Sequence, residues 1–372
     1  MAGVQLTGSQ VARRYHDDVV GPLIRQRWPR LAYAAGRLGS GSDVLGLDDA
    51  ISQDHDWGLR LTLLVEDAAV RAVDEGLQDG LPETFLGLPT RFATTWDPVV
   101  AHRVEVASPD EFAASRLGIA TDRDWDGADW LSVTGQSVLE VTAGPVFTDE
   151  PGRLTAIRRR LSWYPGQVWR YVVAADWVRI GEELPLLGRA GQRGDDLGCA
   201  VIAARLVGIA MHLGFLVERR WPPYPKWLGT GFAGLPRAGA AGPSLRQTMR
   251  SAATPDPEGP GSHGDPSWLR AQSAFGDALA VLLDAQRRVG LPTPAAPTEP
   301  FWDRPFRSLP SAVADSLRAD ITDPLLLSLP AGLGSVEQWV DNVAVLTSGK
   351  RRIAAARSVL GGSGVGSGAP VR

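Results

Sequence analysis

The sequence predicts an α+β protein, in which a small domain with a mixed sheet is followed by a mainly helical bundle domain. Three observations lead to this prediction. Helical and strand patterns alternate over the first third of the chain, and after about residue 125 long helical patterns replace most of the strand patterns. A chain of 372 residues is also longer than one ordinary hydrophobic core requires, which favours two domains.

The first domain is predicted to span residues 1–125. Ser9 is a capping residue for the opening helix, and Ser108 with Pro109 marks the start of a later one. The strand candidates are short segments that alternate between apolar and polar residues or are continuously apolar. The predicted helices are residues 9–28, 66–77 and 108–118, and the predicted strands are residues 31–39, 59–65, 90–96 and 102–108.

The second domain is predicted to span residues 126–350 and to be a mainly helical bundle. A hairpin-like interruption is predicted at residues 145–157, turning on the Glu150-Pro151-Gly152 sequence. The glycine-rich residues 351–372 are predicted to form a disordered tail. The long helices are predicted over residues 166–184, 195–221 and 266–290.

Composition and charge exclude several classes of protein. A hydrophobic content of 44% with 22% charged residues is typical of a globular protein, and the net charge of −4 argues against a broad nucleic-acid-binding surface. The single cysteine, Cys199, excludes an internal disulfide framework and favours a cytoplasmic setting. The most apolar segment contains Arg205 and His212, so we expect a buried core helix there and no membrane span. The N-terminal segment lacks the apolar core of a signal peptide.

Two acids that flank a histidine precede a predicted strand. If Asp54 and Asp56 begin the strand at residues 59–65, the period of two puts both carboxylates on one face and His55 on the other. Carboxylates that converge repel unless a cation neutralises them, and a hard divalent cation such as Mg²⁺ prefers oxygen ligands. The simpler alternative is an Asx-type turn with a surface histidine.

A glycine–serine repeat lies upstream of these acids. The tight turn offers backbone N–H groups and hydroxyl groups that suit phosphate oxygens, at Gly41-Ser42 more than at Gly39-Ser40. Gly41-Ser42, then Gly46, then the acidic pair resembles the signature of the polymerase-β-type nucleotidyltransferase superfamily. That superfamily adds a third acid on a later strand of the sheet, and Glu105 in HRVEV matches it best.

Later segments are similar to an uncharacterised bacterial branch of this superfamily, the domain of unknown function DUF4037. They are residues 189–198, 211–229 and 334–342. The resemblance implies a catalytic half followed by a helical half, similar to aminoglycoside nucleotidyltransferases. The chain departs from the signature in two places, because His55 replaces an apolar residue and Asp43 follows the serine of the turn.

The resemblance implies that Asp54, Asp56 and Glu105 hold Mg²⁺ or Mn²⁺ on a nucleoside triphosphate, with ATP the first candidate. Glu105 would complete the metal site or act as the base for an acceptor hydroxyl group. Attack at the α-phosphorus would then transfer a nucleoside monophosphate, AMP in the case of ATP, and release pyrophosphate. A small hydroxylated acceptor is favoured, and a protein hydroxyl group is the other choice.

Several charged residues of the second domain are open to two interpretations. Lys226, Arg189 or Arg193 could supply a cation for the phosphates, and Lys226 could equally be a solvent-facing residue at a helix start. Asp195 and Asp196 could attract a cationic acceptor, but capping of the long helix is the simpler role.

Two other functions compete with nucleotidyl transfer. A metal-dependent phosphohydrolase of the HD type would use His16, His102 and the His55-Asp56 pair, but that chemistry requires helices where the sequence predicts a strand. The stronger rival is a catalytically silent nucleotide-binding regulatory or interaction protein. Convergence of Glu105 with the acidic pair separates this rival from an enzyme.

Overall fold

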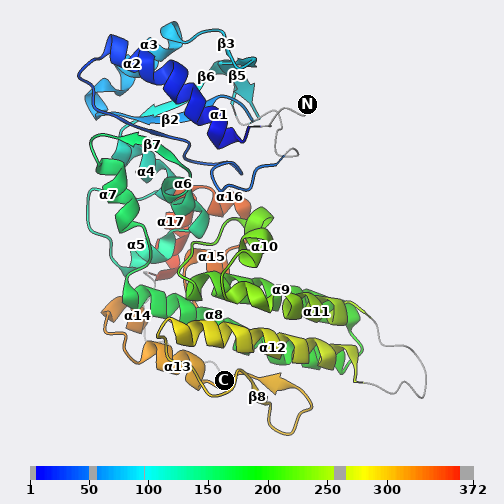
Figure 1. Ribbon diagram of the computed structural model, residues 1–372. Coiled ribbons are helices and arrows are strands. Elements are labelled where there is room, and N and C mark those ends of the chain that lie inside the picture. The colour runs from blue at the N-terminus through cyan, green and yellow to red at the C-terminus, as the bar shows by residue number, and fades with distance from the viewer. Residues whose placement is uncertain (1–5, 50–56, 96, 255–264, 361–372) are drawn as a thin grey trace. The chain divides into compact units, whose positions relative to one another are not determined.

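The computed structural model describes residues 6–49, 57–95, 97–254 and 265–360 (Figure 1). The chain divides into two compact units. The first unit comprises Met1–Asp124 and Ser137–Ser162, and the second comprises Trp125–Gln136 and Trp163–Arg372. The predicted division at residue 125 is therefore close to the first crossing, but it omits the return of residues 137–162 to the first unit.

The first unit contains a mixed sheet with the strand order β5-β6-β2-β1-β7. β2 pairs with β6 in parallel, and the remaining neighbours pair antiparallel. The mixed sheet followed by long helices confirms the predicted α+β class. The strands are β1 (Ala34–Gly36), β2 (Arg60–Leu64), β5 (Arg91–Thr94), β6 (Asp97–Ala107) and β7 (Val146–Asp149), and a separate small hairpin is formed by β3 (Thr84–Phe85) and β4 (Leu88–Pro89).

Residues 137–162 return to the first unit because β7 pairs with β1. The hairpin predicted at residues 145–157 is wrong in its second arm, which forms helix α7 (Arg153–Arg160). Gly152 stands at the N-cap of this helix with a φ of 70°, so the predicted Glu150-Pro151-Gly152 turn leads from a strand into a helix. The apolar side chains of Leu154 and Ile157 have helical spacing and are buried.

The two faces of the sheet differ in chemistry because side chains alternate along β2 and β6. Leu61 and Leu63 of β2 lie in phase with Val104 of β6, and all three belong to the hydrophobic core with residues of the N-terminal helices. Those helices are α1 (Gly8–Tyr15), a π-helical turn (His16–Val20), α2 (Gly21–Arg27) and α3 (Val70–Gly80). The opposite face carries Arg60, Thr62, Arg103 and Glu105.

Helix α4 (Pro109–Leu117) follows β6 directly. Its predicted N-cap is confirmed, since the hydroxyl group of Ser108 accepts a hydrogen bond from the N–H of Glu111 at 3.4 Å. Gly118 ends the helix with a φ of 75°. The short connection keeps the last turn of α4, with Arg116, close to the strand that carries Glu105.

The second unit is built on long helices, as predicted. α8 and α9 pack against each other, and α12 packs against both α11 and α9. The helices of this unit are α5 (Gly127–Ser132), α8 (Gly166–Gly191), α9 (Asp196–Val217), α10 (Pro225–Ala233), α11 (Gly242–Ala252), α12 (Ser267–Arg288), α13 (Ala312–Arg318), α14 (Pro324–Ser328), α15 (Val336–Trp339), α16 (Val343–Leu346) and α17 (Gly349–Leu360), while α6 (Gly135–Thr142) carries the chain back to the first unit.

Helix α9 is long and apolar enough, by length and composition, to cross a membrane. Within the unit it packs against α8, α11 and α12, and 56% of its most apolar window is buried. Cys199 is buried here, where its thiol contacts the carbonyl oxygen of Leu187 at 3.6 Å. The helix therefore has the packing of an interior helix, which agrees with the core role expected for Cys199.

The predicted disordered tail at residues 351–372 is wrong over its first ten residues, because α17 runs through Leu360. Arg352 is 1% exposed, and its Nε donates to the carbonyl oxygen of Ser132 at 2.9 Å. Ala356 and Leu360 lie one helical turn apart and are buried. Residues 361–372 lie outside the described part of the chain.

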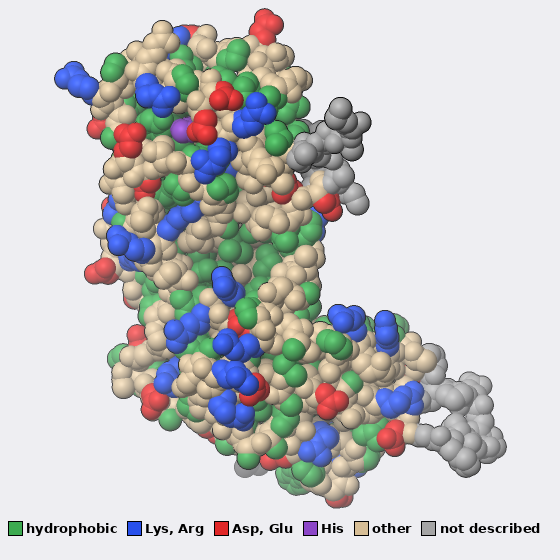
Figure 2. All heavy atoms as spheres, viewed as in Figure 1, with side chains coloured by type: hydrophobic (Ala, Val, Ile, Leu, Met, Phe, Trp, Pro, Cys, Tyr) green, Lys and Arg blue, Asp and Glu red, His purple; other side chains and the backbone are tan. Residues whose placement is uncertain are grey.

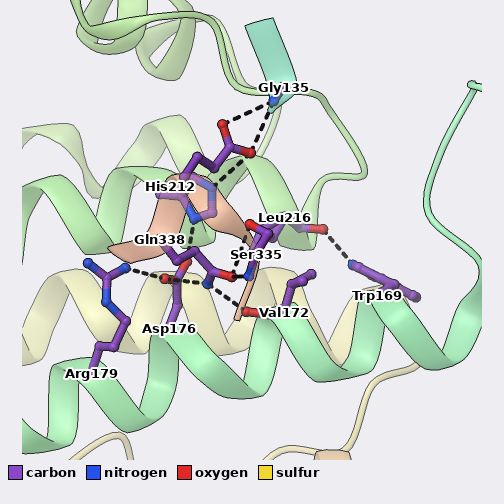
Figure 3. A network of polar contacts seen from close by, with 10 residues as sticks. Gly135, Trp169, Val172, Asp176, Arg179, His212, Leu216, Ser335 and Gln338 are labelled. Carbon is purple, nitrogen blue, oxygen red and sulfur yellow. Dashed lines mark hydrogen bonds and ion pairs between the residues drawn. The ribbon is translucent and has the colours of Figure 1, made fainter. Parts of the chain in front are cut away.

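A buried polar network joins α8, α9 and α15 (Figure 3). Asp176 of α8 is 0% exposed. Its carboxylate accepts hydrogen bonds from Nδ1 of His212 at 2.6 Å, from Nε2 of Gln338 at 2.8 Å and from Nη1 of Arg179 at 3.0 Å. Each carboxylate oxygen is thus satisfied, which a buried charge requires.

The charge on His212 follows from its neighbours. Burial alone would lower the pKa of His212, but the carboxylate of Asp176, with a further contribution from Glu337, raises it to about 10. Burial alone would also raise the pKa of Asp176, and the His212 charge instead holds it below its ordinary value. The raised pKa of His212 stabilises the fold fully below the ordinary imidazole pKa of 6.5, and this stabilisation is lost as the pH rises through about 10.

We expect His212→Gln to lower the free energy of unfolding by about 3–5 kcal/mol at neutral pH, because the buried Asp176 would lose the closer of its two cationic partners and keep only the partly exposed Arg179. The double variant Asp176→Asn, His212→Gln should lose less than the sum of the single variants, since it buries no unpaired charge. Urea denaturation measures both effects. Arg288→Gln, which removes an exposed pair with Asp284, is the control and should leave the unfolding midpoint close to that of the wild type. Equal unfolding midpoints for His212→Gln and the control would contradict the assignment.

Candidate functional site

A cavity of about 300 Å³ lies in the first unit at the polar face of the sheet. Its walls are formed by residues 37–40 after β1, residues 60–62 of β2 and residues 102–105 of β6, together with Thr94 and Arg116. The volume falls at the lower end of the range for small-molecule sites. Most of the lining side chains are polar or charged, so the cavity suits a charged ligand.

Glu105 projects toward this cavity from the middle of β6. It pairs with Thr62 in the parallel register with β2, and its side chain is 41% exposed. Both carboxylate oxygens lie 2.6 Å from Nη2 of Arg116. The structure thus brings the predicted third acid to one cavity with the glycine–serine turn.

The turn after β1 is held by a buried ion pair. Arg37 is 3% exposed, and its Nε and Nη2 donate to the two carboxylate oxygens of Asp43 at 2.6 Å and 2.9 Å. The same guanidinium group donates to the carbonyl oxygens of Leu38 and Ser40 at 2.6 Å and 2.9 Å. Asp43 therefore binds the turn together, which accounts for an acid at a position where the sequence departs from the superfamily signature.

The glycines of the turn have different tasks. Gly41 has a φ of 143°, and a Cβ atom there would overlap Asp43 Oδ1 and lie 2.6 Å from Arg37 Nη2. Gly39 has a φ of 81°, and a Cβ atom there would lie 3.3 Å from Nη2 of Arg116. Gly39 and Ser40 line the cavity, whereas the predicted phosphate-binding pair, Gly41 and Ser42, is not part of its lining.

The arginines that line the cavity were not identified from the sequence. Arg103 donates to the Asp97 carboxylate at 2.7 Å and to the Phe92 carbonyl oxygen at 2.9 Å, so it braces the β5–β6 hairpin. The hydrogen bond from Arg103, with one from the N–H of Val99, lowers the pKa of Asp97. Arg60 and Arg116 also bring guanidinium groups to the lining of the cavity. The in-phase spacing of Arg60 and Thr62 on β2 was the available sequence signal.

His102 is one residue out of phase with Glu105 and has a structural position. Its side chain is 6% exposed, and Nε2 lies 3.4 Å from Oδ1 of Asp74 on α3. His16 is likewise packed, with Nε2 at 3.2 Å from the hydroxyl group of Tyr33. These contacts support neither histidine as a ligand of an HD-type metal centre.

Asp54, His55 and Asp56 lie outside the described residues, so their role stays a prediction. Among the residues that the structure does describe, no group of three or more His, Cys, Asp and Glu side chains could hold a metal ion. Glu105 fits the implied Mg²⁺ or Mn²⁺ by chemistry, because an accessible carboxylate at a polar cavity is a hard oxygen ligand.

The predicted site residues of the second unit are placed as follows. Lys226 is exposed in the first turn of α10, with its ammonium group 5.0 Å from the ring centre of Trp227. The helix start was predicted, and binding of a nucleotide by Lys226 stays a prediction. The carboxylate of Asp195 accepts the N–H of Gly198 at 2.8 Å, which supports its capping role. Arg189 is exposed in the last turn of α8.

Comparison with protein families gives a match for part of the chain. The model of the family "Domain of unknown function (DUF4037)" matches residues 130–228. Residues 189–198 and almost all of residues 211–229 fall inside this match, which confirms the predicted resemblance there. The cavity residues precede the matched segment.

Comparison with individual proteins adds little. No curated protein matches the sequence. Among solved structures, a nucleotidyltransferase-like protein from Exiguobacterium sibiricum 255-15 matches with 12% identity and a TM-score of 0.32, over 76% of this chain and 78% of that chain. Similarity at this level does not establish a shared fold, and nothing is transferred from that protein.

We expect Gly41→Ala to destabilise the first unit by about 2–3 kcal/mol, because it combines an unfavourable φ with overlap of the Arg37–Asp43 pair. The matched control is Gly46→Ala. Gly46 also has a positive φ, of 68°, but no atom lies within 4 Å of a Cβ atom there. The control should cost about 1 kcal/mol. Chemical denaturation of both variants provides the comparison, and equal costs would show that the ion pair does not restrict Gly41.

Proposed function

We propose, with the DUF4037 match over residues 130–228 as the premise, that the chain is a metal-dependent nucleotidyltransferase. It transfers a nucleoside monophosphate, AMP from ATP as the first candidate, to a hydroxyl group of a small molecule. The observation that carries the proposal is the placement of Glu105. This acid opens onto a cavity that is also lined by a glycine–serine turn and by arginines.

The cavity has the groups that a polyphosphate requires. Gly39 and Ser40 line the cavity in a turn that the buried Arg37–Asp43 pair holds in place, and Ser40 offers a hydroxyl group to phosphate oxygens. Arg60 and Arg116 offer guanidinium groups, whose planar geometry suits phosphate oxygens. We therefore move the proposed phosphate contact from Gly41-Ser42 to the preceding glycine–serine pair.

The acids have two tasks in this proposal. Asp54, Asp56 and Glu105 would hold Mg²⁺ or Mn²⁺, and the bound cation would stabilise charge on the phosphoryl oxygens. One carboxylate accepts the proton of the acceptor hydroxyl group. A bond then forms between that oxygen and the α-phosphorus, the bond from the α-phosphorus to its bridging oxygen breaks, and pyrophosphate leaves.

Two observations bear on the acceptor. A second cavity, of about 570 Å³, shares residues 102–105 with the first, so a second molecule has room to approach Glu105. On the face of the molecule shown in Figure 2, Lys and Arg side chains are interspersed with Asp and Glu. This distribution favours a small acceptor over a nucleic acid, which would require a continuous basic surface.

A nucleotide-binding protein without transfer activity is the second candidate. One observation favours it, because Arg116 contacts both carboxylate oxygens of Glu105 and would keep this acid from acting as a ligand or base.

We expect the wild-type protein to be stabilised thermally by ATP with Mg²⁺ and to transfer label from α-labelled ATP to a component of a metabolite pool. Glu105→Gln should lower transfer by about 10²–10³-fold, since a metal ligand or base contributes several kcal/mol to the transition state. Asp54→Asn and Asp56→Asn should act alike. Mass spectrometry identifies the labelled product.

The control for this experiment is Glu111→Gln, which removes an exposed acid from α4 outside the cavity. Transfer by Glu105→Gln at the rate of this control would contradict the assigned role. Binding of nucleotide by the wild type with no transfer to any acceptor would favour the silent nucleotide-binding protein. Absence of stabilisation by any nucleoside triphosphate with Mg²⁺ or Mn²⁺ would count against both functions.

A further inference from the structure

We infer that the Arg116–Glu105 ion pair regulates the site, and that a polyphosphate anion replaces Glu105 as the partner of the Arg116 guanidinium group. Without nucleotide, Arg116 occupies the carboxylate and opposes metal binding. When the phosphates arrive, Arg116 turns to them and Glu105 becomes accessible to the metal. The inference rests on the proposed function, because it concerns the order in which the same site takes its ligands.

The geometry places Arg116 where a cation would contact Glu105. Nη2 lies 2.6 Å from Oε1 and 2.6 Å from Oε2, so one nitrogen faces both oxygens of the carboxylate. A divalent cation that binds a carboxylate through both oxygens needs the same position. Arg116 and a metal ion therefore compete for Glu105.

Arg116 also lies beside the proposed phosphate contact. A Cβ atom on Gly39 would be 3.3 Å from Nη2, so the guanidinium group is packed against the backbone of the turn. A hydrogen bond also fixes this turn to α6, because the carbonyl oxygen of Glu140 accepts a hydrogen bond from the N–H of Gly39 at 2.8 Å. The guanidinium group of Arg116 is thus close to an anion that binds at the Gly39-Ser40 turn.

A second carboxylate and an aromatic ring lie beside the arginine. Nε of Arg116 lies 3.7 Å from Oε2 of Glu140, and the guanidinium carbon lies 4.8 Å from the ring centre of Phe112. The side chain of Arg116 is 23% exposed, so burial does not lock it in place. Glu140 and Phe112 therefore flank the arginine at the edge of the cavity.

Electrostatics favour the exchange. Glu105 is 41% exposed, and an ion pair with such an exposed partner contributes little to stability. A polyphosphate carries several negative charges and accepts two parallel hydrogen bonds from a guanidinium group, which makes it the stronger partner. The free energy lost at Glu105 is thus smaller than that gained at the phosphates.

The test measures metal and nucleotide binding separately, in the full-length protein. Mn²⁺ alone is titrated into each protein in a calorimeter. We expect it to bind Arg116→Gln about fivefold more tightly than the wild type, which is the factor for about 1 kcal/mol. We expect ATP in the presence of EDTA to bind about tenfold more weakly, because a guanidinium–phosphate contact is lost. Circular dichroism verifies that the variant is folded.

The matched control is Arg153→Gln. Arg153 pairs with Asp110 in the same unit at 2.9 Å and does not line the cavity, so this variant has the same change in net charge. It should keep the wild-type affinities for both ligands. If Arg116→Gln does not fold, Arg116→Lys replaces it, and this variant should keep weak Mn²⁺ binding and lose part of the affinity for ATP.

The outcomes separate this inference from the proposed function. If the wild type binds ATP and transfers its nucleotide, but Arg116→Gln binds Mn²⁺ as the control does, the regulatory ion pair is wrong and the transferase stands. If the wild type binds neither Mn²⁺ nor ATP, the proposed function fails and the regulatory ion pair fails with it. Tighter Mn²⁺ binding together with weaker ATP binding by Arg116→Gln supports the exchange.

Discussion

The parallel pairing of β2 with β6 is the constraint on which the first unit depends. In this register Arg60 lies opposite Arg103 and Thr62 lies opposite Glu105, so these four polar side chains fall on one face. Leu61 and Val104 then fall on the other face and meet the helical layer. A shift by one residue would bury the charged face in the core, so the hydrophobic core and the polar cavity are fixed by the same register.

The cavity depends further on the buried Arg37–Asp43 pair. Taking both charges out of water is costly, and the pair is tolerated because the guanidinium group also satisfies the carbonyl oxygens of Leu38 and Ser40. The same contacts set the backbone of the glycine–serine turn before a ligand binds. A pre-formed turn spares the ordering entropy that a flexible loop would lose on binding phosphate. In the proposed function the ion pair would therefore hold the turn ready for the phosphate contact.

The sequence predicted the parts of the fold that depend on local periodicity. The alternation in residues 59–65 and 102–108 identified the two central strands. Glu105 was recognised as a candidate because it is an acid within the otherwise apolar pattern of the second strand. The tail prediction failed because the glycine-rich end of the chain outweighed the helical spacing of Ala356 and Leu360. The second arm of the predicted hairpin failed in the same way, since a Pro-Gly turn can lead into a helix as well as a strand.

The parts of the site that the sequence could not predict depend on contacts between distant residues. The sequence favoured Gly41-Ser42, whereas Gly39-Ser40 lines the cavity. Finding this required knowing that Asp43 turns back onto Arg37, which no spacing rule contains. Arg116 was overlooked because its interest lies in its 2.6 Å contacts with Glu105, eleven residues earlier and across the junction of a strand and a helix. Asp54 and Asp56 lie outside the described residues, so the geometry of the acidic pair rests on the sequence pattern alone.

The charge balance of the cavity connects these observations to the proposed chemistry. Arg37, Arg103 and Arg116 each have a carboxylate partner, namely Asp43, Asp97 and Glu105. A bare polyphosphate would meet Glu105 with repulsion, and a bare metal ion would meet the arginines with repulsion. In the proposed function a polyphosphate and a metal ion would together relieve both, because the phosphates would take Arg116 and the metal would take Glu105. In the proposed function the cavity would therefore suit the complex of the two better than either alone, with Arg116 changing its partner from Glu105 to the phosphates.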